Sequence, residues 1–153
     1  MFVESAMCFL LDGERVLLIR NSRGSSKGKW LGVGGKLDKG ETPEQAIIRE
    51  IREESGVQAK RLAYHGKTNF YMDGKQDLGI IVHIFTCKEF DGNPKSTEEG
   101  ELRWFGKDEF PLDQMWDDTN YWMDLALSGK KFVADFYYDS KNELVKKYQI
   151  ELE

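Results

Sequence analysis

The segment from Gly35 to Val57, GKLDKGETPEQAIIREIREESGV, constrains the fold of this chain more than any other. Thr42 is a suitable N-cap, Pro43 suits the first helical position, and the glutamine three residues after the cap suits a capping box. Gly56 supplies the left-handed residue with which helices commonly end. The pattern therefore predicts a glycine-rich turn followed by a helix from Pro43 to Ser55.

Two faces of this helix differ in character. One face is apolar, is predicted to be buried, and carries Ile47, Ile48 and Ile51. Another carries Glu50, Glu53 and Glu54, because residues three and four apart are neighbours on a helix. Like charges at these spacings repel each other by roughly 0.2–0.5 kcal/mol per pair, and the helix dipole disfavours anions in the last turn. A solvated acidic face is the alternative, but a bound cation explains this unfavourable cluster better.

The residue types of the cluster indicate which cation it would bind. Carboxylates are hard oxygen ligands, which suit Mg²⁺ and also Mn²⁺. No Cys or His lies nearby in the sequence to suggest zinc. Because Mg²⁺ usually keeps several waters and bridges to substrate phosphates, a phosphate ester or anhydride is the expected class of substrate.

The same segment resembles the Nudix box, G-x5-E-x7-R-E-U-x-E-E-x-G-U, in which U is an aliphatic residue. The chain matches each defined position, with Gly35, Glu41, Arg49, Glu50, Ile51, Glu53, Glu54, Gly56 and Val57. The resemblance implies an α/β fold of the Nudix type, an α/β/α sandwich with a central mixed β-sheet. It also implies a hydrolase of nucleoside diphosphate derivatives in which the box glutamates bind Mg²⁺.

Composition and charge narrow the class of partner. A chain of 153 residues suits a single domain over 1–153, and its net charge of −5 argues against a nucleic-acid polymer or an anionic membrane as partner. A small-molecule nucleotide stays compatible, because a metal can neutralise its phosphates. Cys8 and Cys87 lie in apolar segments and are predicted to be buried free thiols, as in a cytoplasmic protein. No membrane span or signal peptide is indicated, and the oligomeric state, monomer or homodimer, is left open.

Apolar patterns and turn residues predict the other elements. A tight turn is expected at 73–75, and 78–87 is expected to be a central strand because it is the most apolar one. A helix is expected at 113–128. The expected strands are 3–11, 16–19, 30–33, 57–72, 78–87, 102–105, 132–138 and 144–152.

Two stretches outside the box are candidates for the phosphate and metal end of a site. The loop from Asn21 to Lys29 and the residue before it supply cations that could reach a triphosphate, namely Arg20, Arg23, Lys27 and Lys29. In Nudix relatives an acidic residue just before a strand of the type LRWF completes the metal site. By its position before Trp104 that residue is Glu99 here, with Glu98 as the alternative.

The segment MWDDTNYW is the candidate for the base end. One interpretation is the acidic first turn of a core helix, which the helix dipole favours. The other is a base pocket, because Trp116 with a neighbouring carboxyl would suit a stacked purine. The segment is similar to W-P-D-D-S-Y-W of MutT-type Nudix enzymes, which hydrolyse oxidised purine nucleoside triphosphates such as 8-oxo-dGTP. Asp118 then matches the first purine-reading acid, Thr119 replaces the second, and Asp117 replaces the proline. Leu31 stands where those enzymes carry a base-contacting asparagine.

The resemblance also implies a mechanism. Glu50, Glu53, Glu54 and Glu99, with the carbonyl of Gly34 or Gly35, would hold Mg²⁺. Glu53 is the expected general base, positioned by Arg49 four residues earlier, and Glu99 is the alternative base. Attack on an internal phosphorus would give a nucleoside monophosphate and pyrophosphate.

Other activities stay open at this point. Within the family the substrate could be ADP-ribose, an RNA cap or a dinucleoside polyphosphate, and Tyr71 lies roughly where enzymes of the last kind carry a tyrosine. A nucleotide sensor without turnover is a further alternative, against which the intact box acids argue. His65 and His83 lie between apolar strand residues and are predicted to be structural.

Overall fold

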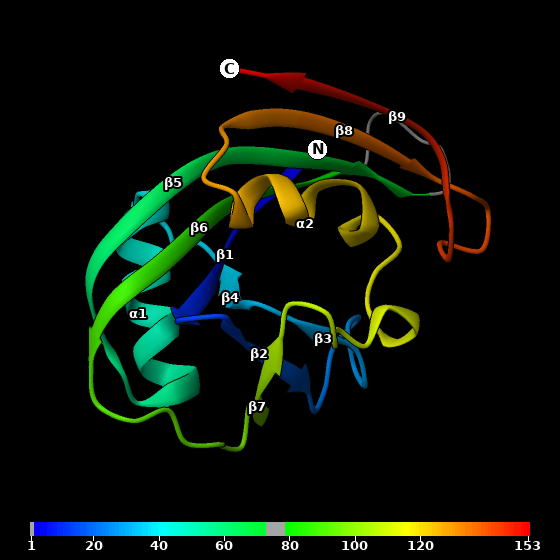
Figure 1. The fold of residues 1–153 in the computed structure, drawn as a ribbon. Helices are drawn as coiled ribbons and strands as arrows, with labels where there is room; N and C mark the ends of the chain where they lie inside the picture. The colour runs from blue at the N-terminus through cyan, green and yellow to red at the C-terminus, as the bar shows by residue number, and fades with distance from the viewer. Residues whose placement is uncertain (1, 73–78) are drawn as a thin grey trace.

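The computed structural model describes residues 2–72 and 79–153. In this part of the chain, nine strands form one sheet, and two α-helices and a short 3-10 helix accompany it (Figure 1). The elements in chain order are β1 (Phe2–Asp12), β2 (Arg15–Asn21), β3 (Trp30–Leu31), β4 (Val33–Lys36), α1 (Pro43–Ser55), β5 (Gln58–Tyr71), β6 (Gly79–Asp91), β7 (Gly100–Gly106), η2 (Leu112–Gln114), α2 (Thr119–Leu127), β8 (Phe132–Tyr138) and β9 (Val145–Leu152).

The sheet is mixed, as predicted. Its main path runs β3-β2-β1-β6-β5-β8-β9, while β4 pairs with β1 and β7 pairs with β2. The pairs β1–β6 and β5–β8 are parallel, and the other pairs are antiparallel. The predicted central position of the most apolar strand is confirmed, because β6 lies in the middle of the path. The turn predicted at 73–75 and the first residue of the predicted strand 78–87 lie outside the described residues.

Two apolar clusters cover the two faces of the sheet, which makes the fold a sandwich. Alternate residues of β1 belong to different clusters. Cys8 and Leu10 pack with Ile47 and Ile51 of α1, while Phe9 packs toward α2. Trp122 of α2 stacks on Phe9 with ring centroids 5.8 Å apart. The predicted α/β/α sandwich is confirmed.

The helix predicted at 43–55 is confirmed at both ends. Thr42 and Gln45 form the reciprocal capping box, and Gly56 adopts the left-handed conformation at φ 77°. On the apolar face Ile47 and Ile51 are fully buried, whereas Ile48 is only half-buried. Ala46 is fully buried as well. Local sequence signals were sufficient here because both caps are made within the segment itself.

The helix predicted at 113–128 is wrong over its first part. The structure has the short helix η2, then irregular backbone through Met115 to Asp118, and only then α2. Met115 is extended, at φ −122° and ψ 160°, and the backbone N–H of Asp118 donates to the hydroxyl of Tyr138 (3.0 Å). A contact with a strand 20 residues further along therefore overrides the local helical pattern.

The strand predicted at 30–33 is divided in two. β3 pairs with β2 and β4 pairs with β1, with the change of partner at Gly32. A Cβ at Gly32 would lie 2.7 Å from Cγ of Met7 and 2.8 Å from the carbonyl oxygen of Cys8. Gly34 and Gly35 consequently lie within β4 rather than after the strand.

Other predicted features are also found. The strands predicted at 132–138 and 144–152 are present as β8 and β9, which pair with each other, and Cys8 and Cys87 are buried free thiols. His65 bonds the carbonyl of Lys130 and the hydroxyl of Thr86, and His83 bonds Tyr64 and Glu4, so both histidines have structural partners. No helix in the described ranges is long and apolar enough to span a membrane.

Candidate active site

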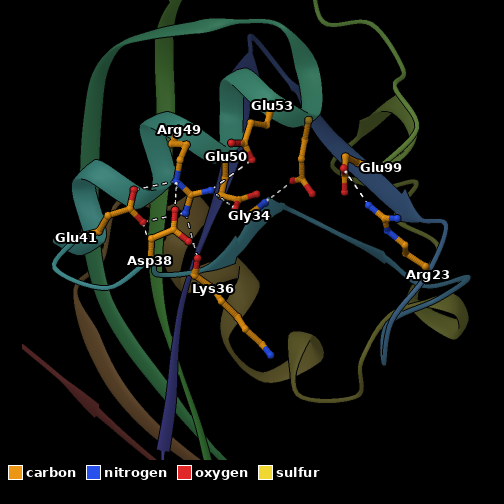
Figure 2. A network of polar contacts seen from close by, with 10 residues as sticks. Arg23, Gly34, Lys36, Asp38, Glu41, Arg49, Glu50, Glu53 and Glu99 are labelled. Atoms are coloured by element: carbon orange, nitrogen blue, oxygen red, sulfur yellow. Dashed lines mark hydrogen bonds and ion pairs between the residues drawn. The ribbon is translucent and has the colours of Figure 1, made fainter.

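Arg49 organises the acidic face of α1. Its guanidinium makes a two-bond ion pair with Glu41, with both N–O distances 2.8 Å, and it also donates to the carbonyl of Lys36 (3.1 Å). On its other side it pairs with Glu50 (2.7 Å) and Glu53 (3.3 Å) (Figure 2). The hydrogen bond from Arg49 is the main reason that the pKa of Glu41 falls from 4.5 to about 2. Arg49 thus ties the loop before α1 to the carboxylates of the helix.

The three box carboxylates differ in environment. Glu54 is buried and accepts a hydrogen bond from the backbone N–H of Gly34 (2.7 Å). The side chain of Glu50 is 13% exposed and lies against Gly35, where an added Cβ would come within 2.8 Å of the carboxyl group. The side chain of Glu53 is 55% exposed. Of the three, Glu53 is therefore the carboxylate most accessible to a water molecule.

The loop between β6 and β7 brings Glu99 to this cluster. The loop docks on the last turn of α1, because the backbone N–H of Lys95 donates to the carbonyl of Ser55 (3.1 Å) and the side-chain hydroxyl of Thr97 donates to the carbonyl of Glu54 (3.4 Å). The Glu99 carboxylate pairs with Arg23 (Figure 2), with an N–O distance of 3.3 Å. Glu98, the alternative, offers its carbonyl to the Ser22 hydroxyl (2.8 Å).

The electrostatics of the cluster fit a cation. Burial is the main reason that the pKa of Glu54 is raised from 4.5 to about 8. The negative charges that add to this effect are those of Glu50, Glu99 and Glu53. Burial likewise raises the pKa of Glu50, against the opposing effect of Arg49. The carboxylates of the cluster thus carry more negative charge than the neighbouring Arg49 neutralises.

The donor set suits a hard divalent ion. Among the described residues, no three Asp, Glu, His or Cys side chains are positioned to ligate one ion together as they stand. Mg²⁺ does not require such a cage, because it commonly takes one or two carboxylates and completes its shell with water and phosphate oxygens. The all-oxygen donors and the close backbone of Gly34 and Gly35 therefore fit Mg²⁺.

Trp116 lies at the second part of the candidate site. It lines a cavity of about 330 Å³, whose other described lining residues are Lys29, Leu112, Asp113, Met115, Asp117, Asn142, Glu143 and Leu144. The indole N–H donates to the hydroxyl of Ser26 (2.9 Å), and the ammonium of Lys29 lies 4.8 Å from the centroid of the indole. An aromatic plane beside polar groups in a cavity is an arrangement that suits a nucleobase.

The loop between β2 and β3 connects the two parts. Its Arg23 meets Glu99 beside the acidic cluster, while its Ser26 and Lys29 meet Trp116. Backbone hydrogen bonds within the loop, such as Gly28 N–H to the carbonyl of Asn21 (2.9 Å), hold its shape. No local sequence pattern indicates the contacts with Trp116, because Ser26 and Trp116 are 90 residues apart.

Asp118 is buried and is not among the residues that line the cavity. It is 3% exposed, and its two carboxylate oxygens accept hydrogen bonds from the indole of Trp122 (2.7 Å) and from the hydroxyl of Tyr138. Asp117, by contrast, lines the cavity and accepts from the backbone N–H of Val145 (2.8 Å). Of the two acids predicted at the base end, Asp117 is the one that faces this space.

Three further predicted substrate contacts lie away from the cavity. Arg20 pairs with Glu101 (2.8 Å) and lies over the Trp30 ring. Leu31 packs into the apolar cluster beneath α1. Tyr71 stacks on Tyr137, with centroids 4.5 Å apart, and its hydroxyl donates to Asp135 (3.3 Å).

The buried carboxyl of Asp118 predicts a pH effect on stability. Burial raises its pKa from 3.8 to about 6, although the bonds from Tyr138 and Trp122 oppose the shift and the charge of Asp117 adds to it. The folded state therefore holds this proton more tightly than the unfolded state. The contribution to the free energy of unfolding is present below about pH 4 and is lost as pH rises through about 6, by up to about 3 kcal/mol.

Urea unfolding between pH 4 and 7 at constant ionic strength checks this expectation. Asp118→Asn removes the titrating group, so its unfolding free energy should fall less steeply over this interval than that of the wild type. Parallel curves for the two proteins, offset but of equal slope, would contradict the prediction.

Comparisons with known proteins agree with this architecture. The family model described as NUDIX domain matches residues 1–126. The chain is 36% identical over 139 residues to the oxidized purine nucleoside triphosphate hydrolase of Mus musculus, covering 91% of this chain and 88% of the relative. It is 40% identical over 131 residues to the protein of the same name from Danio rerio, covering 86% and 83%.

A solved structure gives the same result for the fold. The crystal structure of a mutator MutT protein from Bacillus halodurans superimposes with a TM-score of 0.82 at 25% identity, covering 97% of each chain. The box residues on α1, the mixed sheet and these similarities lead to one conclusion. The chain belongs to the Nudix hydrolase family.

Proposed function

We propose that this chain hydrolyses oxidised purine nucleoside triphosphates, such as 8-oxo-dGTP, to the nucleoside monophosphate and pyrophosphate. The observation that carries the proposal is that one loop joins an acidic, cation-seeking cluster at Glu99 to an aromatic cavity at Trp116. A nucleoside triphosphate has the matching two ends, a charged phosphate chain and a base. Two relatives similar over most of their length carry a name with this activity, which supports the choice of substrate.

We infer that Mg²⁺, with Mn²⁺ as a substitute, is the cofactor. Its ligands would be Glu50, Glu53, Glu54 and Glu99, with the backbone carbonyl of Gly34 or Gly35. When bound, such an ion neutralises phosphate charge and lowers the pKa of a coordinated water. Residues of the chain would orient the ligands of the ion. The backbone N–H of Gly34 donates to the Glu54 carboxylate, and the Arg49 guanidinium donates to the Glu50 carboxylate.

Glu53 is our candidate for the general base. Its carboxylate is the most exposed of the box acids, and its contact with Arg49 keeps it on the acidic face of α1. A base must reach the proton that it removes directly or through one water, which an exposed carboxylate can do. Glu99 is the alternative base. Arg23, which already meets Glu99, and Arg20 are our candidates for binding the phosphate chain.

The proposed role in the cell follows from the reaction. Removing oxidised purine nucleotides from the pool would keep them out of newly made DNA, which is a form of DNA repair by prevention. The buried free thiols of Cys8 and Cys87 support a reducing compartment, the cytoplasm. We expect the protein to act on the free nucleotide, as a monomer or homodimer, without a nucleic-acid polymer or membrane as partner.

A panel of nucleotides tests the proposal. With Mg²⁺ present, 8-oxo-dGTP should be hydrolysed with a kcat/KM at least about tenfold above that of dGTP, because the base is read by polar groups. Pyrophosphate should be released, and a chelator should abolish turnover. Equal rates for both nucleotides would reduce the assignment to a generic triphosphatase, whereas faster hydrolysis of ADP-ribose or diadenosine tetraphosphate would replace it.

A further inference from the structure

The cavity at Trp116 combines charges of both signs. Its described lining residues include three acids, Asp113, Asp117 and Glu143, but a single cation, Lys29. The other described lining residues are the amide Asn142 and the apolar Leu112, Met115, Leu144 and Trp116. A ligand that fills this space therefore meets one positively charged hydrogen-bond donor and several carboxylate acceptors around the indole plane.

Lys29 is directed to the indole by the loop that carries it. Its ammonium lies 4.8 Å from the centroid of the Trp116 ring, and the side chain is half-buried. Three residues earlier in the same loop, Ser26 accepts the indole N–H at 2.9 Å. The backbone N–H of Lys29 in turn donates to the carbonyl of Ser26 (2.9 Å), which fixes the two contacts relative to each other.

The two purine types present different atoms to such a cavity. A guanine-type base offers the O6 acceptor together with N1–H and N2–H₂ donors, whereas an adenine-type base offers an N6 amino donor in place of O6. A lysine ammonium only donates hydrogen bonds, and carboxylates only accept them. One cation beside several acids is therefore complementary to the guanine edge and places an ammonium against the adenine amino group.

We propose that Lys29 determines the base specificity of this site, by donating to O6 of a guanine-type purine that stacks on Trp116. The inference rests on the proposed function and extends it to the choice between guanine-type and adenine-type substrates. The flexible four-carbon stem of lysine lets the ammonium leave the ring face for the edge of the base as the base takes its place on the indole. Lys29 is thus a specificity residue at the base and has no part in phosphate chemistry.

Binding of product nucleotides to the full chain tests this role without turnover. Isothermal titration with 8-oxo-dGMP and 8-oxo-dAMP would give the dissociation constants for the wild type and for Lys29→Met, which keeps the apolar stem and removes the charge. The wild type should prefer 8-oxo-dGMP. Lys29→Met should bind 8-oxo-dGMP about tenfold more weakly while its affinity for 8-oxo-dAMP stays the same or rises.

Lys147→Met is the matched control. Lys147 also places its ammonium over an aromatic ring, that of Tyr137 at 5.3 Å, but it lies on β9 away from the cavity. This variant loses the same charge and the same kind of contact, so it should keep the base preference of the wild type.

The outcomes separate this inference from the proposed function. An equal effect of Lys29→Met on both nucleotides, no effect on either, or a wild type that binds neither would overturn the role of Lys29. Hydrolysis of 8-oxo-dGTP by the wild type is measured in parallel. Its absence would contradict the proposed function, while the ratio of the two dissociation constants still decides the role of Lys29.

Discussion

Glu53→Gln should lower kcat for nucleoside triphosphate hydrolysis by a factor of about 10²–10⁴, the usual contribution of a general base. The amide keeps the size of the side chain but cannot accept a proton. Folding should be little affected, because the Glu53 side chain is 55% exposed and its one described ion pair is the 3.3 Å contact with Arg49. Steady-state kinetics with 8-oxo-dGTP at saturating Mg²⁺ measure the effect.

Glu44→Gln provides the control for this measurement. Glu44 lies on the same helix, in its first turn, and is exposed. The substitution removes the same charge far from the acidic cluster, so kcat should stay near that of the wild type. If Glu53→Gln also turned over at nearly the normal rate, Glu53 would be excluded as the base, and Glu99→Gln would be the next variant to measure.

Gly34→Ala should lower the free energy of unfolding by about 3 kcal/mol, at the upper end of the range for overpacked sites. A Cβ at Gly34 would fall deep inside van der Waals contact with the carbonyl oxygen of Ala6 and lie 2.8 Å from Cα of Met7. Both are backbone atoms of β1, which is paired with β4 at this point. Since neither side chain rotation nor solvent can relieve the clash, the two strands must separate locally.

The neighbouring glycine supplies a matched variant. A Cβ at Gly35 would meet the carboxyl group of Glu50 at 2.8 Å, the movable end of a side chain. Gly35→Ala should therefore cost much less stability than Gly34→Ala, although it displaces Glu50. Urea unfolding of both variants measures the difference. Equal losses would show that close backbone approach is not what requires glycine at Gly34.

The features that could be predicted from the sequence are those whose stabilising contacts lie within one segment of the chain. Helix α1 was predicted to the residue because its caps, at Thr42 and Gly56, lie within the segment. The central place of β6 followed from its apolar content, whereas the mixed sheet is part of the Nudix-type fold that the resemblance implies. The resemblance to the Nudix family indicates Glu99 as a metal ligand, and the structure brings that residue to the box acids through a loop docked on α1.

Contacts between distant residues were the ones missed. The continuous helix predicted at 113–128 failed because Tyr138, a later strand residue, binds the backbone and the carboxyl of Asp118. The same bonds keep Asp118 out of the cavity lining. Resemblance of the segment to related enzymes therefore could not show that Asp117, and not Asp118, lies beside Trp116 in the cavity. Lys29 was expected near phosphate, since nothing in a polar loop indicates that its lysine will meet an indole far along the chain.

The β2–β3 loop has a thermodynamic consequence for how ligands would occupy the molecule. It is a short, internally bonded segment that touches Glu99 at one end and Trp116 at the other. If a base bound at Trp116 changes the affinity of the carboxylates for an ion through this segment, the bound ion changes the affinity for the base by the same factor. This follows because linkage between two binding equilibria is reciprocal. Affinity at one end is then a property of what occupies the other.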